Sequence, residues 1–251
     1  MNWTACPFVM IDTETTGLPW ISSRVVEVGA TAFKLSSEPT KPEFLGTFQS
    51  LVNPGRCALE GPQALKALEI NQISPTDLEC APPFPEVAKG LANFLEEVAK
   101  QNRGCDLILA AYNAEFDFQM LAAEYIRCGT EMPLSIINNH KNNFSGWVDP
   151  LIWCRDAFIG VKEGHSLSAQ RKRLSLTTEG PAHRALNDAI DSAKIFNWLT
   201  LGGHHALTNS RIYGTPFCDL NELLTWQEML ASSQNHIKKK NILFNHIKQT
   251  A

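Results

Sequence analysis

The sequence predicts an α/β domain built on a mixed β-sheet, and three observations support this prediction. The first fifty residues contain three short apolar segments rich in β-branched side chains. After residue 60 the apolar residues recur at helical spacing, with short apolar runs between the helical segments. Strands first, followed by alternating helices and strands, are typical of a sheet flanked by helices. The composition fits a folded domain, since 44% of the 251 residues are hydrophobic and 19% are charged.

The three predicted N-terminal strands cover residues 8–11, 25–33 and 44–52. The first is a short apolar run that ends in polar residues and Gly17, which is typical of a buried strand leading into a loop. The third is stopped by the turn-forming residues at positions 53–55. Because the connections between these segments are short, we expect them to form an antiparallel meander.

The rest of the chain is predicted to alternate between helices and strands. In the segment 84–101, apolar residues at helical spacing line one face, as in an amphipathic helix. The segment 106–112 is an apolar run that we interpret as a buried strand, and 147–153 is a weaker strand candidate. The predicted helices are 62–70, 84–101, 114–127, about 166–174, and 184–201.

The last fifty residues form a separate unit in this interpretation. The pair Gly202-Gly203 is a plausible domain edge, which gives a domain at 1–201 and a mainly helical extension at 202–251. Asp219 is expected to cap a helix that contains several leucines. About fifty residues bury little core by themselves, so we expect the extension to pack on the main domain or on a partner.

Charge and cysteine content restrict the class of protein. The formal net charge of −4 argues against a duplex-DNA binder that works through a broad basic face. No two of the seven cysteines lie closer than 23 residues, which excludes CxxC sites and fits buried, reduced thiols. The apolar runs are too short to span a membrane, and the N-terminus has no signal-peptide pattern. A cytoplasmic protein is therefore expected.

Asp12 and Glu14 stand at the end of the first predicted strand. Side chains of a strand alternate between faces, so both carboxylates point to the same side of the sheet. Adjacent carboxylates repel each other unless a cation lies between them, and oxygen ligands of this kind suit Mg²⁺ or Mn²⁺. A second pair, Asp77 and Glu79, follows no strand and is interpreted as a solvated helix start.

Two further segments supply acidic residues and a histidine. Asp117 would project from the first turn of the 114–127 helix, with Glu115 as a competitor for the same role. Five helical residues turn through about 500°, so His183 and Asp188 would not share a face if both were helical. The chemistry works if His183 lies in the preceding loop while Asp188 lies on the helix. Such a set is typical of a two-metal hydrolase, in which the histidine deprotonates the attacking water.

These motifs resemble those of the DnaQ-like 3′→5′ exonucleases of the DEDDh class. The three motifs at 12–18, 113–117 and 183–188 occur in the family's order, and the resemblance covers about residues 6–200. It implies a ribonuclease H-like fold, with a mixed five-stranded sheet flanked by helices. It also implies two bound cations, Mg²⁺ or Mn²⁺, and His183 as the general base. The implied metal-binding carboxylates are Asp12, Glu14, Asp117 and Asp188.

The resemblance also implies a set of residues that contact the terminal nucleotide. Asn71 belongs to a variant of the family's His/Asn-Gly-Ile segment, in which Gln72 replaces the usual Gly. Tyr112 and Asn187 replace a frequent His and a frequent Asp at positions that are not metal ligands. The catalytic set is therefore intact, and we expect an active enzyme. The implied substrate-binding residues are Thr15, Thr16, Leu18, Asn71 and Asn113.

The favoured function is a metal-dependent exonuclease that releases nucleoside 5′-monophosphates from the 3′ ends of single-stranded DNA, in proofreading or repair. One alternative is an enzyme that trims RNA 3′ ends. Another is a polymerase-associated proofreading subunit, in which residues 202–251 tether the chain to the polymerase. The basic run 171–173 could steer a nucleic-acid backbone or be a solvated helix end. For Trp147 and Trp153, core packing is favoured over base stacking.

Overall fold

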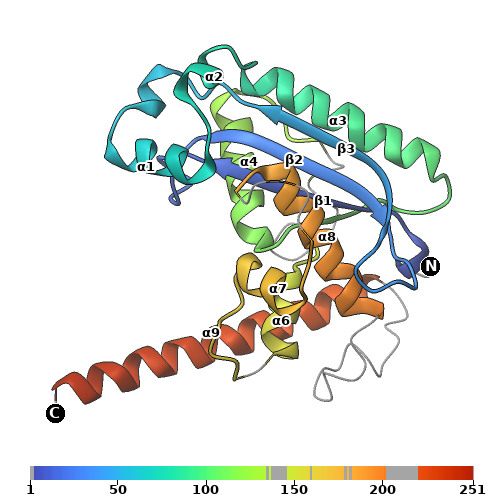
Figure 1. Ribbon diagram of the computed structural model, residues 1–251, viewed down its shortest axis with the longest axis vertical. Helices are drawn as coiled ribbons and strands as arrows, with labels where there is room; N and C mark the ends of the chain where they lie inside the picture. The colour runs from blue at the N-terminus through green and yellow to red at the C-terminus, as the bar shows by residue number, and fades with distance from the viewer. Residues whose placement is uncertain are drawn as a thin grey trace.

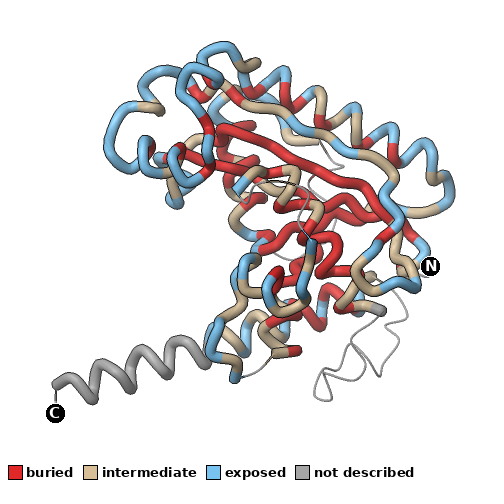
Figure 2. The backbone as a smooth tube through the Cα atoms, in the orientation of Figure 1, coloured by how far each residue is buried: buried red, intermediate tan, exposed pale blue. Residues whose placement is uncertain are grey.

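A computed structural model describes residues 3–133, 136, 146–158, 160–177, 180, 183–201 and 220–250, with the backbone alone for 201 and 236–250. The sheet in this part of the chain has the strand order β3-β2-β1-β4. Helices cover both of its faces (Figure 1). The strands at residues 8–15, 25–34 and 108–110 are largely buried between these two layers, whereas residues 43–51 of the edge strand are partly or fully exposed (Figure 2).

The sheet combines an antiparallel meander with one parallel strand. β1 (Phe8–Thr15) pairs antiparallel with β2 (Val25–Lys34), which pairs antiparallel with β3 (Glu43–Leu51). β4 (Ile108–Ala110) pairs parallel with β1. The predicted meander and the mixed sheet are therefore confirmed, with β1 in the interior of the sheet.

The predicted helices are also present, with bounds within a few residues of those expected. Two 3-10 helices, η1 (Trp3–Ala5) and η2 (Arg56–Leu59), add short turns. Eight α-helices have described bounds: α1 (Pro62–Asn71), α2 (Pro75–Glu79), α3 (Phe84–Gln101), α4 (Ala114–Arg127), α6 (Pro150–Ala157), α7 (Leu167–Arg173), α8 (Ala185–Leu201) and α9 (Leu220–Thr250).

Alternate residues of β1 face two separate hydrophobic clusters. Val9 and Ile11 belong to a cluster with residues of α3 and α4. Phe8 and Met10 belong to a cluster with residues of α6, α8 and α9. The same alternation places Asp12 and Glu14 on the α8 side of the sheet, because the side-chain period of a strand is two.

The prediction of a strand at 147–153 is wrong. Val148 makes an isolated parallel bridge with Ala110, and the chain then enters α6. The Asp149 carboxylate accepts a hydrogen bond from the Leu151 amide at 2.9 Å, and Pro150 occupies the first turn. A capping Asp followed by Pro starts a helix, since Pro fixes φ at a helical value and needs no N–H partner there. The described part of the sheet thus has four strands rather than five.

The described part of the C-terminal extension is helical, as expected. Leu223, Leu224 and Trp226 of α9 are buried in the same cluster as Phe8. The candidate boundary at Gly202-Gly203 and the candidate cap Asp219 lie outside the described residues.

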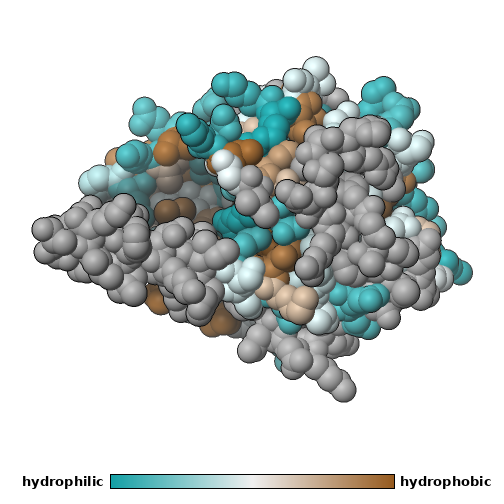
Figure 3. Space-filling view, turned by 90° about the horizontal axis from the view of Figure 1, so that it is seen from below, coloured by the Kyte–Doolittle hydropathy of each residue, from teal (hydrophilic) through white to brown (hydrophobic). Residues whose placement is uncertain are grey.

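Two further expectations concern the burial of the cysteines and the length of the apolar segments. The six cysteines in the described ranges are free thiols, but Cys57 and Cys80 are exposed rather than buried. None of the helices described is long and apolar enough to cross a bilayer. On the face seen from below, hydrophobic and hydrophilic residues alternate in small groups (Figure 3).

Candidate active site

The end of β1 presents two carboxylates in a poorly hydrated position. Glu14 is 9% exposed, and Asp12 is partly buried beside it. Loss of water raises the pKa of Glu14 to about 8, and the negative charges of Asp188, Glu27 and Asp117 add to the shift. Burial also raises the pKa of Asp12, and the negative charges of Asp117, Asp188 and Glu14 raise it further.

Asp117 of α4 is held at β1 by Thr13, the residue between Asp12 and Glu14 in the sequence. The Thr13 amide and the Thr13 hydroxyl both donate to Asp117 Oδ1, at 2.9 Å and 2.7 Å. Burial raises the pKa of Asp117 to about 7, while the two hydrogen bonds from Thr13 oppose that shift. The competitor Glu115 is exposed on the same helical turn and accepts a hydrogen bond from Gln119. Of these two acidic residues, Asp117 is therefore the one that reaches the cluster.

His183 and Asp188 lie as their spacing required. His183 precedes α8, is exposed, and has a left-handed backbone with φ of 62°. Asp188 lies in the first turn of α8 and is 7% exposed. Possible ligand atoms of Glu14, His183 and Asp188 all lie within 4.8 Å of one another.

The start of α8 is fixed on β2 by Glu27. The Glu27 side chain is fully buried and accepts hydrogen bonds from Arg184 Nη2 at 2.7 Å and from the Ala185 amide at 3.0 Å. Glu27 is also the cross-strand partner of Glu14. This one carboxylate therefore sets the position of the helix that carries Asp188 relative to the strand that carries Glu14.

Gly29 lets α8 approach the sheet. It is paired with Asp12 across the strands, and a Cβ at this position would lie 2.2 Å from the Leu186 amide nitrogen. The obstructing atoms belong to the backbone, so they cannot move without shifting the helix. Only glycine fits this contact.

We expect Gly29→Ala to lower the free energy of unfolding by about 2–3 kcal/mol, the cost of overpacking against a backbone that must shift. Gly46→Ala is the control, because a Cβ there would lie 3.5 Å from the Phe94 ring, an ordinary contact. Urea denaturation of both variants measures the difference. Equal stability of the two variants would show that α8 does not rest on Gly29.

Arg171 on α7 joins the acidic cluster, which the sequence did not reveal. Its Nη2 donates to Asp188 Oδ1 at 2.6 Å, and its Nε donates to Asp191 Oδ2 at 2.7 Å. Asp191 also pairs with Lys194 at 3.2 Å. Arg171 is 9% exposed, so it is neither a steering charge on the surface nor a solvated helix end. Its positive charge opposes the rise in the pKa of Asp12.

The sequence contains an indication of one of these contacts but not of the others. Asp188 and Asp191 are three residues apart on a helix, so their carboxylates share one face and a cationic partner was a reasonable inference. Nothing in the local sequence identified Arg171 as that partner. Thr13 lies between the two acidic residues of the motif, yet alternation places it on the opposite face of the strand. The sequence therefore gave no indication of its hydrogen bonds to Asp117.

Four of the predicted substrate-binding residues lie at the end of β1 and the loop that follows it, or are bonded to it: Thr15, Thr16, Leu18 and Asn71. Thr15 and Thr16 are buried, and Asn71 Nδ2 donates to the Thr15 carbonyl at 3.3 Å. Leu18 is 77% exposed. Asn113 is exposed at the N-terminus of α4, with φ of 75°. The structure thus brings Asn71 onto the 15–18 loop, and it leaves Leu18 and Asn113 accessible.

The donor set fits divalent cations. Burial, together with repulsion by neighbouring carboxylates, raises the pKa of Asp12 and Glu14, and burial raises the pKa of Asp117. Carboxylate oxygens with one adjacent imidazole suit Mg²⁺ or Mn²⁺, whose charge would remove this repulsion. A mixed sheet with such a cluster at the end of an interior strand defines a ribonuclease H-like nuclease.

The comparisons with known proteins agree with that class. Residues 9–196 match the RNase T family of exonucleases, and the chain therefore belongs to this exonuclease family. The resemblance to DnaQ-like enzymes of the DEDDh class is confirmed, and the protein is an exonuclease of this type. Members of the class use divalent metal ions.

Two curated relatives are at least 30% identical. The exonuclease DPD1 of Arabidopsis thaliana, chloroplastic or mitochondrial, is 32% identical over 200 residues, which are 77% of this chain and 56% of that protein. The DNA polymerase III epsilon subunit of Treponema pallidum is 30% identical over 203 residues, 80% of this chain and 79% of that subunit. The chain thus spans little more than half of the plant relative.

Solved structures share the fold. The nuclease domain of 3′hExo, a DEDDh family member bound to rAMP, superposes with a TM-score of 0.62 at 15% identity, over 82% of this chain and 96% of that domain. Exonuclease I of E. coli in complex with a dA16 oligonucleotide gives a TM-score of 0.60 at 15% identity, over 80% of this chain and 42% of that enzyme.

Proposed function

We propose that this chain removes nucleoside 5′-monophosphates one at a time from the 3′ end of single-stranded DNA. The observation that carries the proposal is the group of Glu14, Asp188 and the exposed His183, together with Asp12, whose pKa is raised by burial and by the charges of Asp117, Asp188 and Glu14. The similarity to a DNA polymerase III epsilon subunit supports DNA as the substrate class.

Each residue of the cluster has a separate task in this proposal. The four carboxylates would hold two divalent cations, which when bound polarise the scissile phosphate and stabilise the leaving 3′ oxygen. An imidazole nitrogen of His183 accepts the proton of the attacking water, and exposure of the ring lets it release that proton to solvent. Arg171 orients Asp188 through its bond to Oδ1.

The strand end would be held by the loop that follows β1. The exposed Leu18 side chain can pack against the terminal base, while backbone groups at Thr15 and Thr16 bind the nucleotide. Asn71 supports this loop through its bond to the Thr15 carbonyl. Contacts of this kind do not by themselves distinguish DNA from RNA, because that choice depends on a contact to the 2′-OH.

The test is a time course on 5′-labelled DNA and RNA oligonucleotides of one sequence, with Mg²⁺, with Mn²⁺ and with EDTA. We expect a ladder that shortens from the 3′ end, faster on DNA, with 5′-monophosphate products. An oligonucleotide with a blocked 3′ end is the control and should stay intact. Activity in EDTA, or cleavage inside the blocked strand, would contradict the proposal. Faster digestion of RNA would reassign the substrate to the alternative.

A role for residues 202–251 as a polymerase tether has less support. The relationship to an epsilon subunit favours it. The buried positions of Leu223 and Trp226 favour instead a helix that is packed on the catalytic domain along residues 220–235.

A further inference from the structure

Gln227 of α9 is buried and forms hydrogen bonds to residues 147–149, which precede α6 and pair with the end of β4 through Val148. Only 8% of the residue is exposed. Its Nε2 donates to the Trp147 carbonyl at 3.0 Å, and its Oε1 accepts from the Asp149 amide at 2.8 Å. A glutamine amide that uses both its donor and its acceptor on one short backbone segment fixes the position of that segment.

Asp149 connects residues 147–149 to the N-terminus of α4 through hydrogen bonds. Its carboxylate accepts hydrogen bonds from the Asn113 amide at 3.0 Å and from the Ala114 amide at 3.2 Å, besides the bond from Leu151 that caps α6. Asp149 is 6% exposed. A single buried carboxylate therefore serves the N-termini of two helices, where negative charge is favourable.

The first turn of α4 ends at the candidate metal ligand. Asn113 has a left-handed conformation, which asparagine adopts more readily than most residues other than glycine, and its amide is held by the bond to Asp149. Four residues later, Asp117 is bonded to Thr13 of β1. A continuous chain of hydrogen bonds and one helical turn thus runs from α9 to the acidic cluster.

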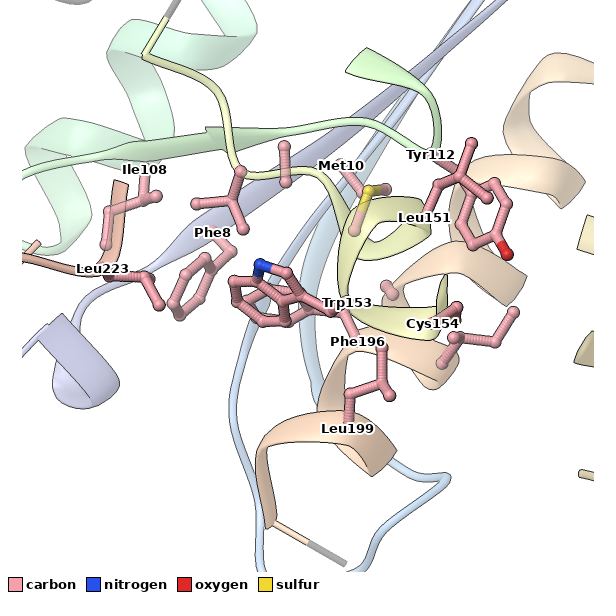
Figure 4. Packing of buried hydrophobic residues seen from close by; sticks show 14 of the residues in the cluster. Phe8, Met10, Ile108, Tyr112, Leu151, Trp153, Cys154, Phe196, Leu199 and Leu223 are labelled. Atoms are coloured by element: carbon pink, nitrogen blue, oxygen red, sulfur yellow. The ribbon is translucent and has the colours of Figure 1, made fainter. Parts of the chain in front are cut away.

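Packing keeps α9 in register for these bonds. Leu223 lies close to Phe8 and Trp153 in the hydrophobic cluster (Figure 4). The rings of Trp153 and Trp226 are 6.3 Å apart between centroids. The side chains of Leu223 and Trp226, which precede Gln227, therefore anchor this turn of the helix against the core.

We propose that Gln227 is a positioning residue for the exonuclease reaction, acting through Asp149 and the first turn of α4 on Asp117. The catalytic unit then includes residues 220–235, and the division of the chain at residue 201 is not a functional boundary. This inference rests on the proposed function, because it assigns Gln227 a role in that same site.

The test compares Gln227→Met with Gln234→Met in the full-length chain. Methionine has a similar shape and cannot make the amide hydrogen bonds. Gln234 is the matched control, since it lies two turns later on the same helix and donates to the Ile152 carbonyl of α6 at 3.0 Å rather than to residues 147–149. Hydrogen exchange at the Asn113 and Ala114 amides, in metal-free protein, reports on α4 directly.

In Gln227→Met we expect exchange at these two amides to become about tenfold faster. We also expect Mn²⁺ affinity and kcat to fall about tenfold with KM within about twofold, as for other residues that orient metal ligands. Gln234→Met should stay within about twofold of the wild type in each measurement. If Gln227→Met does not fold, Gln227→Asn, an uncharged amide one methylene shorter, weakens both bonds and gives a milder form of the same comparison.

Equal exchange rates and equal kcat in the two methionine variants would overturn the inference, even if both melt at a lower temperature than the wild type. The exchange measurement needs neither metal nor substrate. Absence of nuclease activity in the wild type would therefore refute the proposed function while leaving the coupling from α9 to α4 open to this test.

Discussion

Asp12→Ala is expected to lower the rate of nucleotide release at least about a thousandfold while the protein stays folded. A metal ligand contributes several kcal/mol of charge stabilisation in the transition state, and each 1.4 kcal/mol is about tenfold in rate. Single-turnover assays on labelled single-stranded DNA measure the loss. Glu115→Ala is the control, because this exposed carboxyl lies outside the acidic cluster, and it should keep its rate within about twofold.

The same variant should be more stable than the wild type when metal is absent and the pH is high. The folded-state pKa values of Glu14 and Asp117 are raised to about 8 and about 7, above the ordinary 4.5 and 3.8. The folded protein therefore binds more protons than the unfolded chain in this window. Its metal-free stability declines as pH rises from about 4 to about 8. Removal of Asp12 takes away one of the repelling charges.

Thermal unfolding in EDTA between pH 5 and pH 8.5 checks this expectation. Asp12→Ala should melt above the wild type at pH 8, with a smaller difference at pH 5, and added Mg²⁺ should stabilise the wild type more than the variant. A variant that melts below the wild type at pH 8 would mean that its inactivity reflects a damaged fold rather than a missing ligand.

His183→Ala is expected to reduce the rate by about 10² to 10⁴ and to change Mn²⁺ affinity far less, because a general base acts on the proton rather than on the cation. The geometry also fits a second role for His183, as a metal ligand, since one of its ring nitrogens lies within 4.8 Å of carboxylate oxygens of Glu14 and Asp188. Parallel measurement of single-turnover rate and Mn²⁺ binding separates the two roles. An equal loss of both would make His183 a metal ligand.

A backbone control is needed at this position. His183 has a φ of 62°, which alanine adopts less readily than glycine. His183→Gly relaxes that conformation and should be as inactive as His183→Ala. Recovery of activity in the glycine variant would trace the loss to the backbone instead of the imidazole.

Most elements of the fold followed from local sequence patterns. The meander, the long amphipathic α3 and the helix at 114–127 were predicted with bounds close to those observed. The strand predicted at 147–153 failed because its apolar side chains were given more weight than the Asp149-Pro150 pair, which is a helix start. Apolar periodicity over so short a segment does not separate a strand from a buried helix, whereas a cap followed by proline does.

The sequence by itself determined which side chains are available for chemistry. The alternation in β1 placed Asp12 and Glu14 on one face, and the five-residue interval required His183 to lie outside the helix that carries Asp188. These are properties of neighbouring residues, so backbone geometry alone decides them.

Only the tertiary structure decided how those side chains are held. The bond from Thr13 to Asp117 joins residues 104 positions apart, and that from the Asp149 amide to Gln227 joins residues 78 apart. Gly29 matters because a particular helix crosses it, and Arg171 because a particular helix brings it to Asp188. Contacts of this kind depend on how elements pack together, and packing of distant segments is not encoded in the local periodicity of any one of them.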